Sequence, residues 1–304
     1  MSTDWRADLL VEAATLRPEL HRYCARLTGS VIDGEDVVQD ALARALVALE
    51  GMDEPPSTPR PWLFRIAHNR ALDLLRSRAV RRSEPLEAAS EVADPEAPDP
   101  METLMRREAI QTAVSRFVEL PTRQRSVVIL KDVLGESLAD IAALLDLTID
   151  AVKAHLARGR ARLRELNALA EVVTQGPPPP PSPAVVRYVT LFNQRDWDGL
   201  RALLADDVGL VQSNRARRVG AADVGAFFGN YAKVDGLRLA PAWLEGREVI
   251  AVFDGPAATP SYFMWLEWRD GRISFIRDYR YVRYVAEAAE LVLAPPPSGD
   301  RPLG

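Results

Sequence analysis

The sequence predicts three domains: a bundle of helices, a second all-α domain with a helix-turn-helix, and an α+β domain. Apolar residues recur at helical spacing through residues 1–82 and 101–173. Residues 184–290 differ, because predicted helices there give way to alternating strands around Asp270 and Gly271, which suit a tight turn. A chain of 304 residues is long enough for several domains that each bury a core. We therefore expect a multidomain protein.

Two linkers and a tail accompany these domains. Residues 83–100 hold six acids, four prolines and no base, which predicts an extended acidic linker. Residues 174–183 contain a run of five prolines, which predicts a stiff spacer that rises about 3 Å per residue. The last segment, residues 291–304, is rich in proline, and we expect it to be a disordered tail.

Composition limits the functions that the chain can have. The lone Cys24 excludes an internal disulfide and a cysteine-built zinc site, and it fits a reducing compartment. The amino end has neither a basic start nor an apolar run, and no stretch approaches the length that spans a bilayer. We therefore expect a soluble cytoplasmic protein with no membrane contact, no metal and no cofactor. Its formal net charge is −5, so a cluster of bases needs a local explanation.

The first block is predicted to form three helices. The first helix ends at Gly29, a residue type favoured just after a helix end. The second is expected to start at Asp33 as N-cap, with Glu35 and Asp36 in the first turn, where carboxylates complement the helix dipole. The prolines of "EGMDEPPSTPRP" then break the chain, and a third helix follows.

The third helix is rich in arginine, although the protein as a whole is acidic. Residues 61–82 contain one acid, Asp73, and six arginines: Arg65, Arg70, Arg76, Arg78, Arg81 and Arg82. At about 100° per residue, one face is apolar and carries Leu63, Ile66, Ala67, Ala71 and Leu74. The other face carries Arg65, His68, Asn69 and Arg76. This pattern fits either a solvated amphipathic helix or a face that meets something anionic.

The second block carries a helix-turn-helix pattern. The short helix "SLADIAALL", the turn "DLT" and a last helix follow one another within residues 120–165. Four apolar residues are spaced to pack the two helices together: Ile141, Leu145, Val152 and Leu156. The last helix also carries basic residues that are available to contact DNA phosphates and nucleobase edges: Lys153, His155, Arg158, Arg160, Arg162 and Arg164. The alternative is a plain helical hairpin without a DNA-binding role.

Three stretches resemble one known family. "DGEDVVQDALARAL" is similar to region 2.2 of sigma-70 family RNA polymerase sigma factors of the extracytoplasmic-function (ECF) group. "PWLFRIAHNRALDLLRSR" resembles their region 2.4, and residues 120–163 resemble their region 4. These matches follow the order of the family over residues 5–166. The resemblance implies two all-α sigma domains that bind core polymerase and promoter DNA, and that initiate transcription.

The resemblance also implies roles for individual residues. Core polymerase would be bound through its β′ clamp helices and its β flap, with Asp36, Gln39 and Asp40 on the docking surface. The minus-10 element would be met by Arg65, His68, Asn69 and Arg76. The minus-35 element would be met by Lys153, His155, Arg158 and Arg160. In relatives, a segment like the acidic linker threads polymerase channels that otherwise carry nucleic acid.

Some residues leave alternatives open. Trp62, beside the loop before the third helix, would either stack on an unpaired base or close the helix bundle, and buried aromatics are far more common. Asp150 would either accept from a cytosine amino group or cap the last helix, and we favour the cap. The chain also has Ala151 and His155 where relatives commonly have a small polar residue and an arginine. The minus-35 sequence therefore does not follow from the preference of the family.

The third block resembles SnoaL-like domains, which are cone-shaped α+β folds that extend a subset of these sigma factors. The resemblance rests on the order of helices and strands and on "FNQRDWDGLRALLADDV". We expect this domain to regulate the sigma regions in cis, without a separate anti-sigma protein. The candidate interdomain contacts are Tyr279, Arg280, Tyr281 and Arg283.

Enzymes also use this fold, so catalysis is the alternative for the third block. Its candidate acids and bases would be Tyr188, Asp207, Glu267, Asp278 and Tyr279. Fold does not imply function, and we expect no enzymatic activity and no catalytic residue. A further alternative for the whole chain is a helix-turn-helix regulator without core binding, whose last domain senses a small ligand or acts as an enzyme.

Overall fold

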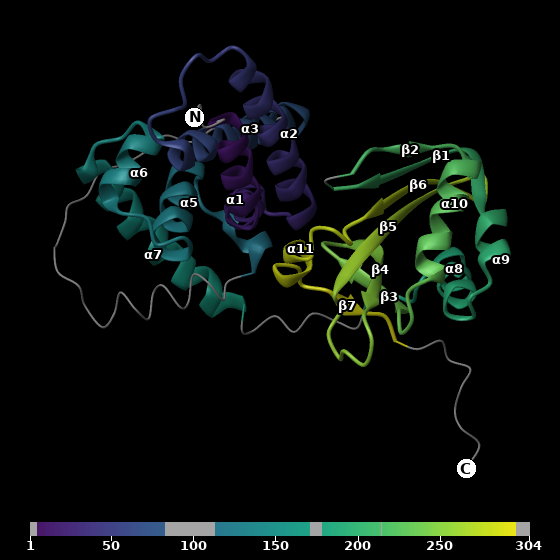
Figure 1. The fold of residues 1–304 in the computed structure, drawn as a ribbon. Coiled ribbons are helices and arrows are strands. Elements are labelled where there is room, and N and C mark those ends of the chain that lie inside the picture. Colours follow the sequence, from purple (N-terminus) through teal and green to yellow (C-terminus); the bar gives the residue numbers. More distant parts are fainter. Residues whose placement is uncertain (1–4, 83–112, 171–177, 214, 296–304) are drawn as a thin grey trace. The chain divides into compact units, whose positions relative to one another are not determined.

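The computed structural model describes residues 5–82, 113–170, 178–213 and 215–295 (Figure 1). The chain divides into two compact units, Met1–Thr174 and Gln175–Gly304. The predicted acidic linker and most of the predicted tail lie outside the described residues. No described helix is both long enough and apolar enough to cross a membrane.

The first half of unit 1 is the predicted three-helix bundle. Its helices are α1 (Trp5–Thr28), α2 (Val31–Glu50) and α3 (Pro59–Arg82). Gly29 follows α1 with a φ of 78°, the left-handed conformation that glycine adopts without strain. The predicted cap of α2 is wrong by three residues, because the Ser30 side chain accepts a hydrogen bond from the backbone N–H of Asp33 at 3.1 Å. The Asp33 carboxylate instead binds Arg78 of α3 at 2.7 Å.

The second half of unit 1 contains the predicted helix-turn-helix. Its elements are the 3-10 helix η1 (Val114–Glu119), α5 (Thr122–Val128), the π-helical turn η2 (Ile129–Val133), α6 (Leu138–Leu145) and α7 (Ile149–Ala170). Asp146 makes the turn between α6 and α7 in the left-handed conformation. The Thr148 hydroxyl caps α7 by accepting from the Ala151 N–H at 3.1 Å. Asp150 lies in the first turn of α7, so the cap that we favoured for it is wrong.

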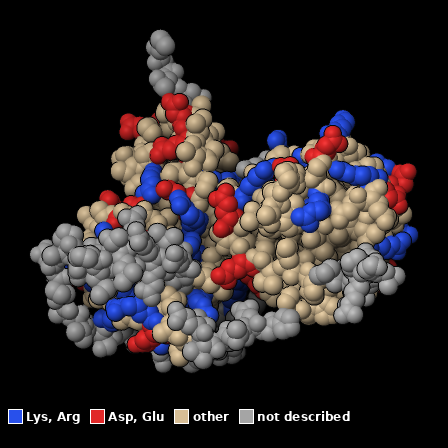
Figure 2. Space-filling view, turned by 90° about the horizontal axis from the view of Figure 1, so that it is seen from below, with Lys and Arg blue, Asp and Glu red and all other residues tan. Residues whose placement is uncertain are grey.

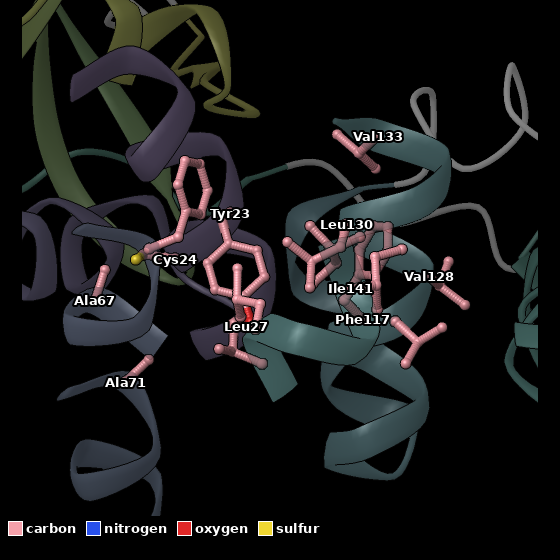
Figure 3. Packing of buried hydrophobic residues seen from close by; sticks show 14 of the residues in the cluster. Tyr23, Cys24, Leu27, Ala67, Ala71, Phe117, Val128, Leu130, Val133 and Ile141 are labelled. Atoms are coloured by element: carbon pink, nitrogen blue, oxygen red, sulfur yellow. The ribbon is translucent and has the colours of Figure 1, made fainter. Parts of the chain in front are cut away.

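The two halves of unit 1 share one hydrophobic core (Figure 3). Tyr23 and Leu27 of α1 belong to the same buried cluster as Phe117 and Ile141 of the second half. Arg125 of α5 is buried here and donates to the backbone oxygens of Leu27 (2.6 Å), Val118 (2.7 Å) and Leu120 (2.9 Å). At Gly29, an added Cβ would lie 2.1 Å from a methyl carbon of Val118, so glycine permits this close approach. The two halves of unit 1 are therefore packed together, an arrangement called closed below.

Unit 2 is an α+β domain whose three longer helices pack on one face of a curved sheet (Figure 1). Its helices are α8 (Pro183–Asn193), α9 (Trp197–Ala202), α10 (Ala221–Ala232) and the short α11 (Tyr284–Glu287). Its strands are β1 (Leu204–Gln212), β2 (Arg218–Val219), β3 (Arg238–Leu244), β4 (Arg247–Phe253), β5 (Tyr262–Arg269), β6 (Arg272–Asp278) and β7 (Val292–Leu293). The strand order is β2-β1-β6-β5-β4-β3-β7, and among these described strands only β1 and β6 pair in parallel. The predicted hairpin is β5–β6, with Asp270 and Gly271 both at positive φ.

One boundary differs from the sequence prediction. We expected a tail from residue 291, but Val292 and Leu293 form β7 and pair with Trp243 and Ala242 of β3. The backbone N–H of Ala294 also donates to the Pro241 oxygen at 2.9 Å. The ordered domain therefore extends beyond the predicted boundary at residue 290.

Candidate nucleic-acid and polymerase interfaces

The exposed face of α3 carries three of the four residues predicted for the minus-10 element. Arg65 and Asn69 are exposed, and the Arg76 side chain is 73% exposed beside Asp73 at 3.5 Å. Arg65 is already engaged within unit 1, because its Nη2 donates to the backbone oxygen of Ala143 in α6 at 2.8 Å. The face is therefore basic, but the second half of the unit occupies part of it.

His68, the fourth predicted residue, is turned inward. Its Nδ1 forms a hydrogen bond with the Tyr23 hydroxyl at 2.7 Å. Burial, and then the nearby Arg76, lower the pKa of His68 to about 4, so its imidazole is neutral at pH 7. The prediction that His68 lies on the open face is wrong. The position of a residue on a helix fixes the direction of its Cβ, but the side-chain rotamer decides which group the ring contacts. His68 supports the α1–α3 packing instead.

The recognition helix α7 presents a narrower basic face than the sequence suggested. Lys153 and Arg158 are partly exposed, whereas His155 is only 8% exposed. Burial is the main cause that lowers the pKa of His155, followed by the charges of Arg158 and Arg123. Arg123, an exposed residue of α5, was missed in the sequence analysis, because only the fold brings it near α7. It adds a base beside the recognition helix.

Arg160 does not belong to this face. Its guanidinium makes two hydrogen bonds to Asp132, at 2.9 and 2.6 Å, and Asp132 is only 1% exposed. These bonds hold the guanidinium against a buried carboxylate, and the Arg160 side chain is only 15% exposed, so the placement contradicts the predicted minus-35 contact. Arg160 instead compensates a buried carboxylate.

Arg158 is partly exposed whereas Arg160 is paired with a buried carboxylate, so replacing each side chain by alanine should have a different effect. If Arg158 has the role that the sequence predicts, Arg158→Ala should weaken binding of a minus-35 duplex about fivefold and flatten its salt dependence, since one cation that would meet a phosphate is removed. Arg160→Ala should lower the free energy of unfolding by about 2–3 kcal/mol, because Asp132 would be left unpaired. Fluorescence anisotropy and urea denaturation measure the two effects. Equal losses in both variants would contradict the distinction.

The residues predicted for core polymerase lie on the outer side of α2. Asp36 and Gln39 are partly exposed, and Asp40 is exposed and paired with Arg70 of α3 at 2.8 Å. Positions three and four apart share a helix face, so these side chains form one polar strip. The neighbouring Glu35 is fully buried and binds Arg17 at 2.5 Å. The ion pair between Glu35 and Arg17 therefore anchors α2 from its buried side, opposite the polar strip.

Trp62 packs inside the bundle. It is partly buried against the cluster of Ala13, Ala45 and Leu63. This is the packing arrangement that we favoured for it. The face drawn in Figure 2 mixes acidic and basic side chains.

The predicted interdomain residues of unit 2 divide between the interior and the surface. Tyr279 is buried, with its ring 4.4 Å from that of Phe263. Tyr281 is 43% exposed, and Arg283 binds Asp254 at 2.9 Å. Arg280 lies over the Tyr231 ring at 5.0 Å. Burial of Tyr279 contradicts its predicted role as a surface contact.

The alternative catalytic residues do not form one site. Asp207 is exposed and pairs with Arg269, whose hydrogen bond lowers the pKa of the Asp207 carboxyl. Glu267 is exposed as well, whereas Tyr188 and Asp278 are buried in the interior. No group of three or more His, Cys, Asp or Glu side chains suited to a metal occurs in the parts of the chain that the structure describes.

Comparisons with known proteins agree with the order of these elements. The family models for Sigma-70 region 2 and Sigma-70 region 4 match residues 13–81 and 110–163. SigG of Mycobacterium tuberculosis, an ECF RNA polymerase sigma factor, is 33% identical over 64% of this chain, and the match spans 58% of SigG, less than two thirds of its length. CnrH of Cupriavidus metallidurans, an RNA polymerase sigma factor, is 37% identical over 44% of this chain and 73% of CnrH.

Among solved structures, the ECF sigma factor SigJ of Mycobacterium tuberculosis aligns with 91% of this chain and 98% of its own, at 20% identity and a TM-score of 0.34. The family rests on the sequence matches rather than on this alignment. Regions 2 and 4 occur in order, and CnrH is matched over most of its length. SigW of Bacillus subtilis, an ECF RNA polymerase sigma factor, is 30% identical and is matched over 83% of its length, so the chain belongs to the family of ECF RNA polymerase sigma factors.

Proposed function

We propose that the chain recruits core RNA polymerase to promoters, reads the minus-10 and minus-35 elements and initiates transcription. The observation that carries this proposal is the set of three surfaces on unit 1. The polar strip lies on α2, a basic face lies on α3, and α7 is the second helix of the helix-turn-helix. A regulator that only binds DNA would need the third surface alone.

Core binding is assigned to Asp36, Gln39 and Asp40, which would meet the β′ clamp helices, while the second half would meet the β flap. Asp36→Arg should weaken core binding about tenfold or more, since it reverses a charge on the proposed docking surface. Gel filtration with core polymerase measures this. Glu12→Arg is the matched control, because Glu12 is exposed on α1 of the same bundle.

The two possible failures of this experiment differ in meaning. If wild-type protein does not co-elute with core polymerase, the sigma function is wrong and a helix-turn-helix regulator is favoured. If both charge reversals leave co-elution unchanged, the sigma function stands and the assignment to the α2 strip is wrong.

Promoter contacts are assigned to the side chains that remain accessible. Asn69 and Arg76 of α3 would meet the minus-10 element, and Arg65 would join them once its bond to Ala143 is released. Lys153 and Arg158 of α7, with Arg123 of α5, would meet the minus-35 element. Phosphate contacts of this kind supply affinity through counterion release, and base contacts supply specificity.

We also propose that unit 2 regulates unit 1 in cis and takes the place of a separate anti-sigma protein. A tethered domain reaches an effective concentration of about 1 mM, so even a weak contact is populated. The prolines of residues 178–181 and 183 would keep the tether short. The accessible candidates for contact are Arg280, Tyr281 and Arg283.

Truncation after Val173 tests this regulation. Removal of unit 2 should change transcription from a cognate promoter by about twofold or more, because a contact with a Kd near the effective concentration is half populated. The change has either sign, since the domain would inhibit or assist. Run-off transcription across a range of polymerase concentrations measures it. Identical transcription at every concentration would show that unit 2 is a passive appendage.

A further inference from the structure

The outward side of α7 carries one carboxylate followed by small residues. Val152, Leu156 and Leu163 are buried and mark the side of α7 that packs on the rest of unit 1. At about 100° per residue, four positions point away from that side and form the outer ridge of α7: Asp150, Ala154, Ala157 and Ala161. All four are exposed or partly exposed. The outer ridge is therefore the line along which α7 would meet a partner.

The Asp150 carboxylate lies at the amino end of this ridge and is not the helix cap. The Thr148 hydroxyl accepts the Ala151 N–H at 3.1 Å, which is the bond that a capping side chain makes. Asp150 is the second residue of α7 and is exposed. A carboxylate in the first turn is favourable beside the helix dipole, but that effect is available to any partner surface or none. The carboxylate is therefore presented to whatever the outer ridge meets.

The alanines of the ridge allow α7 to approach a surface closely. A helix rises 1.5 Å per residue, so Asp150 and Ala157 are about 10 Å apart along the axis, roughly three base steps of 3.4 Å on one DNA strand. Because the other members of the ridge are alanines, the backbone of α7 can lie near base edges over this interval. Asp150 needs such an approach, since its short side chain reaches only groups near the backbone. The ridge therefore suits a helix that enters the major groove.

Two basic residues flank the ridge. Lys153 lies on one side of it and Arg158 on the other, and both are partly exposed. Phosphates line both walls of the major groove, so cations at these two positions would offset the repulsion between the phosphates and the Asp150 carboxylate. An anion between two cations is a poor surface for phosphate alone, but it suits a groove whose floor offers a hydrogen-bond donor.

We propose that Asp150 selects a cytosine in the minus-35 element by accepting a hydrogen bond from the amino group of that base, an inference that rests on the proposed promoter reading by α7. In the major groove cytosine presents its amino donor, and a carboxylate only accepts. Guanine presents two acceptors and thymine presents one, so both would repel the carboxylate. Adenine presents a donor beside its N7 acceptor and is second best.

Selection from a mapped promoter whose minus-35 region is randomised tests the proposal, with the full-length protein bound to core polymerase. We expect wild type to enrich cytosine at one position, and Asp150→Ala to lower that enrichment about fivefold while other positions keep their preferences. Asp150→Asn should move the preference at that position toward adenine, because an amide accepts from N6 and donates to N7. The four bases are compared within one variant, so a change in overall affinity does not alter the result.

Glu165→Ala serves as the control, since it removes a carboxylate from an exposed position farther along the same helix, and it should leave the base preference unchanged. The proposal is overturned if Asp150→Ala keeps the cytosine preference of wild type, as expected of a carboxylate that only stabilises the amino end of α7. Wild type that enriches other minus-35 bases but no cytosine overturns the Asp150 contact alone. Wild type that enriches no minus-35 base contradicts the proposed promoter reading too.

Discussion

Arg125→Met should lower the free energy of unfolding of unit 1 by about 4 kcal/mol, the largest stability loss that we expect from one exchange. Arg125 is 6% exposed, and its guanidinium serves three backbone oxygens, one of them at the end of α1. Burial lowers its pKa to about 10, still well above neutrality, so the side chain stays charged. Methionine fills similar space but leaves all three oxygens unpaired.

Urea denaturation measures the loss of stability, and Arg123→Met is the matched control. Arg123 lies two residues earlier on the same helix but is exposed, so its exchange should stay within about 0.5 kcal/mol of wild type. Similar values for the two variants would mean that the buried bonds do not hold the halves of unit 1 together.

Glu136→Arg should raise the affinity of the free protein for single-stranded DNA that carries a minus-10 element by about tenfold. Arg60 of α3 forms ion pairs with Glu136 and with Glu19, and the Glu136 side chain is only 14% exposed. A second arginine at position 136 would repel Arg60 and favour separation of α3 from α6. Separation would release Arg65 from Ala143, and its guanidinium could then bind DNA.

Anisotropy of a labelled oligonucleotide from a mapped promoter measures this gain. Glu165→Arg makes the same charge change at an exposed position of α7, away from Arg60. It therefore controls for the general attraction of an added positive charge to DNA. Adding Arg65→Ala to Glu136→Arg should remove most of the gain. If Glu136→Arg gains no more than Glu165→Arg, the closed arrangement does not restrict the α3 face.

Local patterns predicted most of the elements. Apolar spacing indicated α1, α2, α3, α6 and α7, and turn chemistry at Asp270 and Gly271 indicated the β5–β6 hairpin. The two wrong caps have a physical cause. Ser30 and Asp33, like Thr148 and Asp150, are both able to accept an N–H, and only the backbone conformation decides which one does.

Long-range partners could not be read from the sequence. In the sequence, Arg160 looks like the other basic residues of its helix, and only the fold brings it to Asp132, 28 residues away. His68 turns to Tyr23 for the same reason. Tyr188 and Asp278 were named among the candidate acids and bases, but only the fold shows that both are buried. The strand β7 has only two residues, and its existence depends on β3.

The short strand β7 also covers an edge of the sheet. Without it, β3 would present unpaired backbone groups at Ala242 and Trp243, and such edges are templates for addition of a strand from another molecule. Pro241 lacks an N–H, which makes β3 a poor partner at that position in any case. A protein that ends at Glu290 would therefore keep its core but lose the cover on β3, and it would be prone to edge-to-edge aggregation. The last residues of the ordered domain thus contribute to keeping the molecules apart.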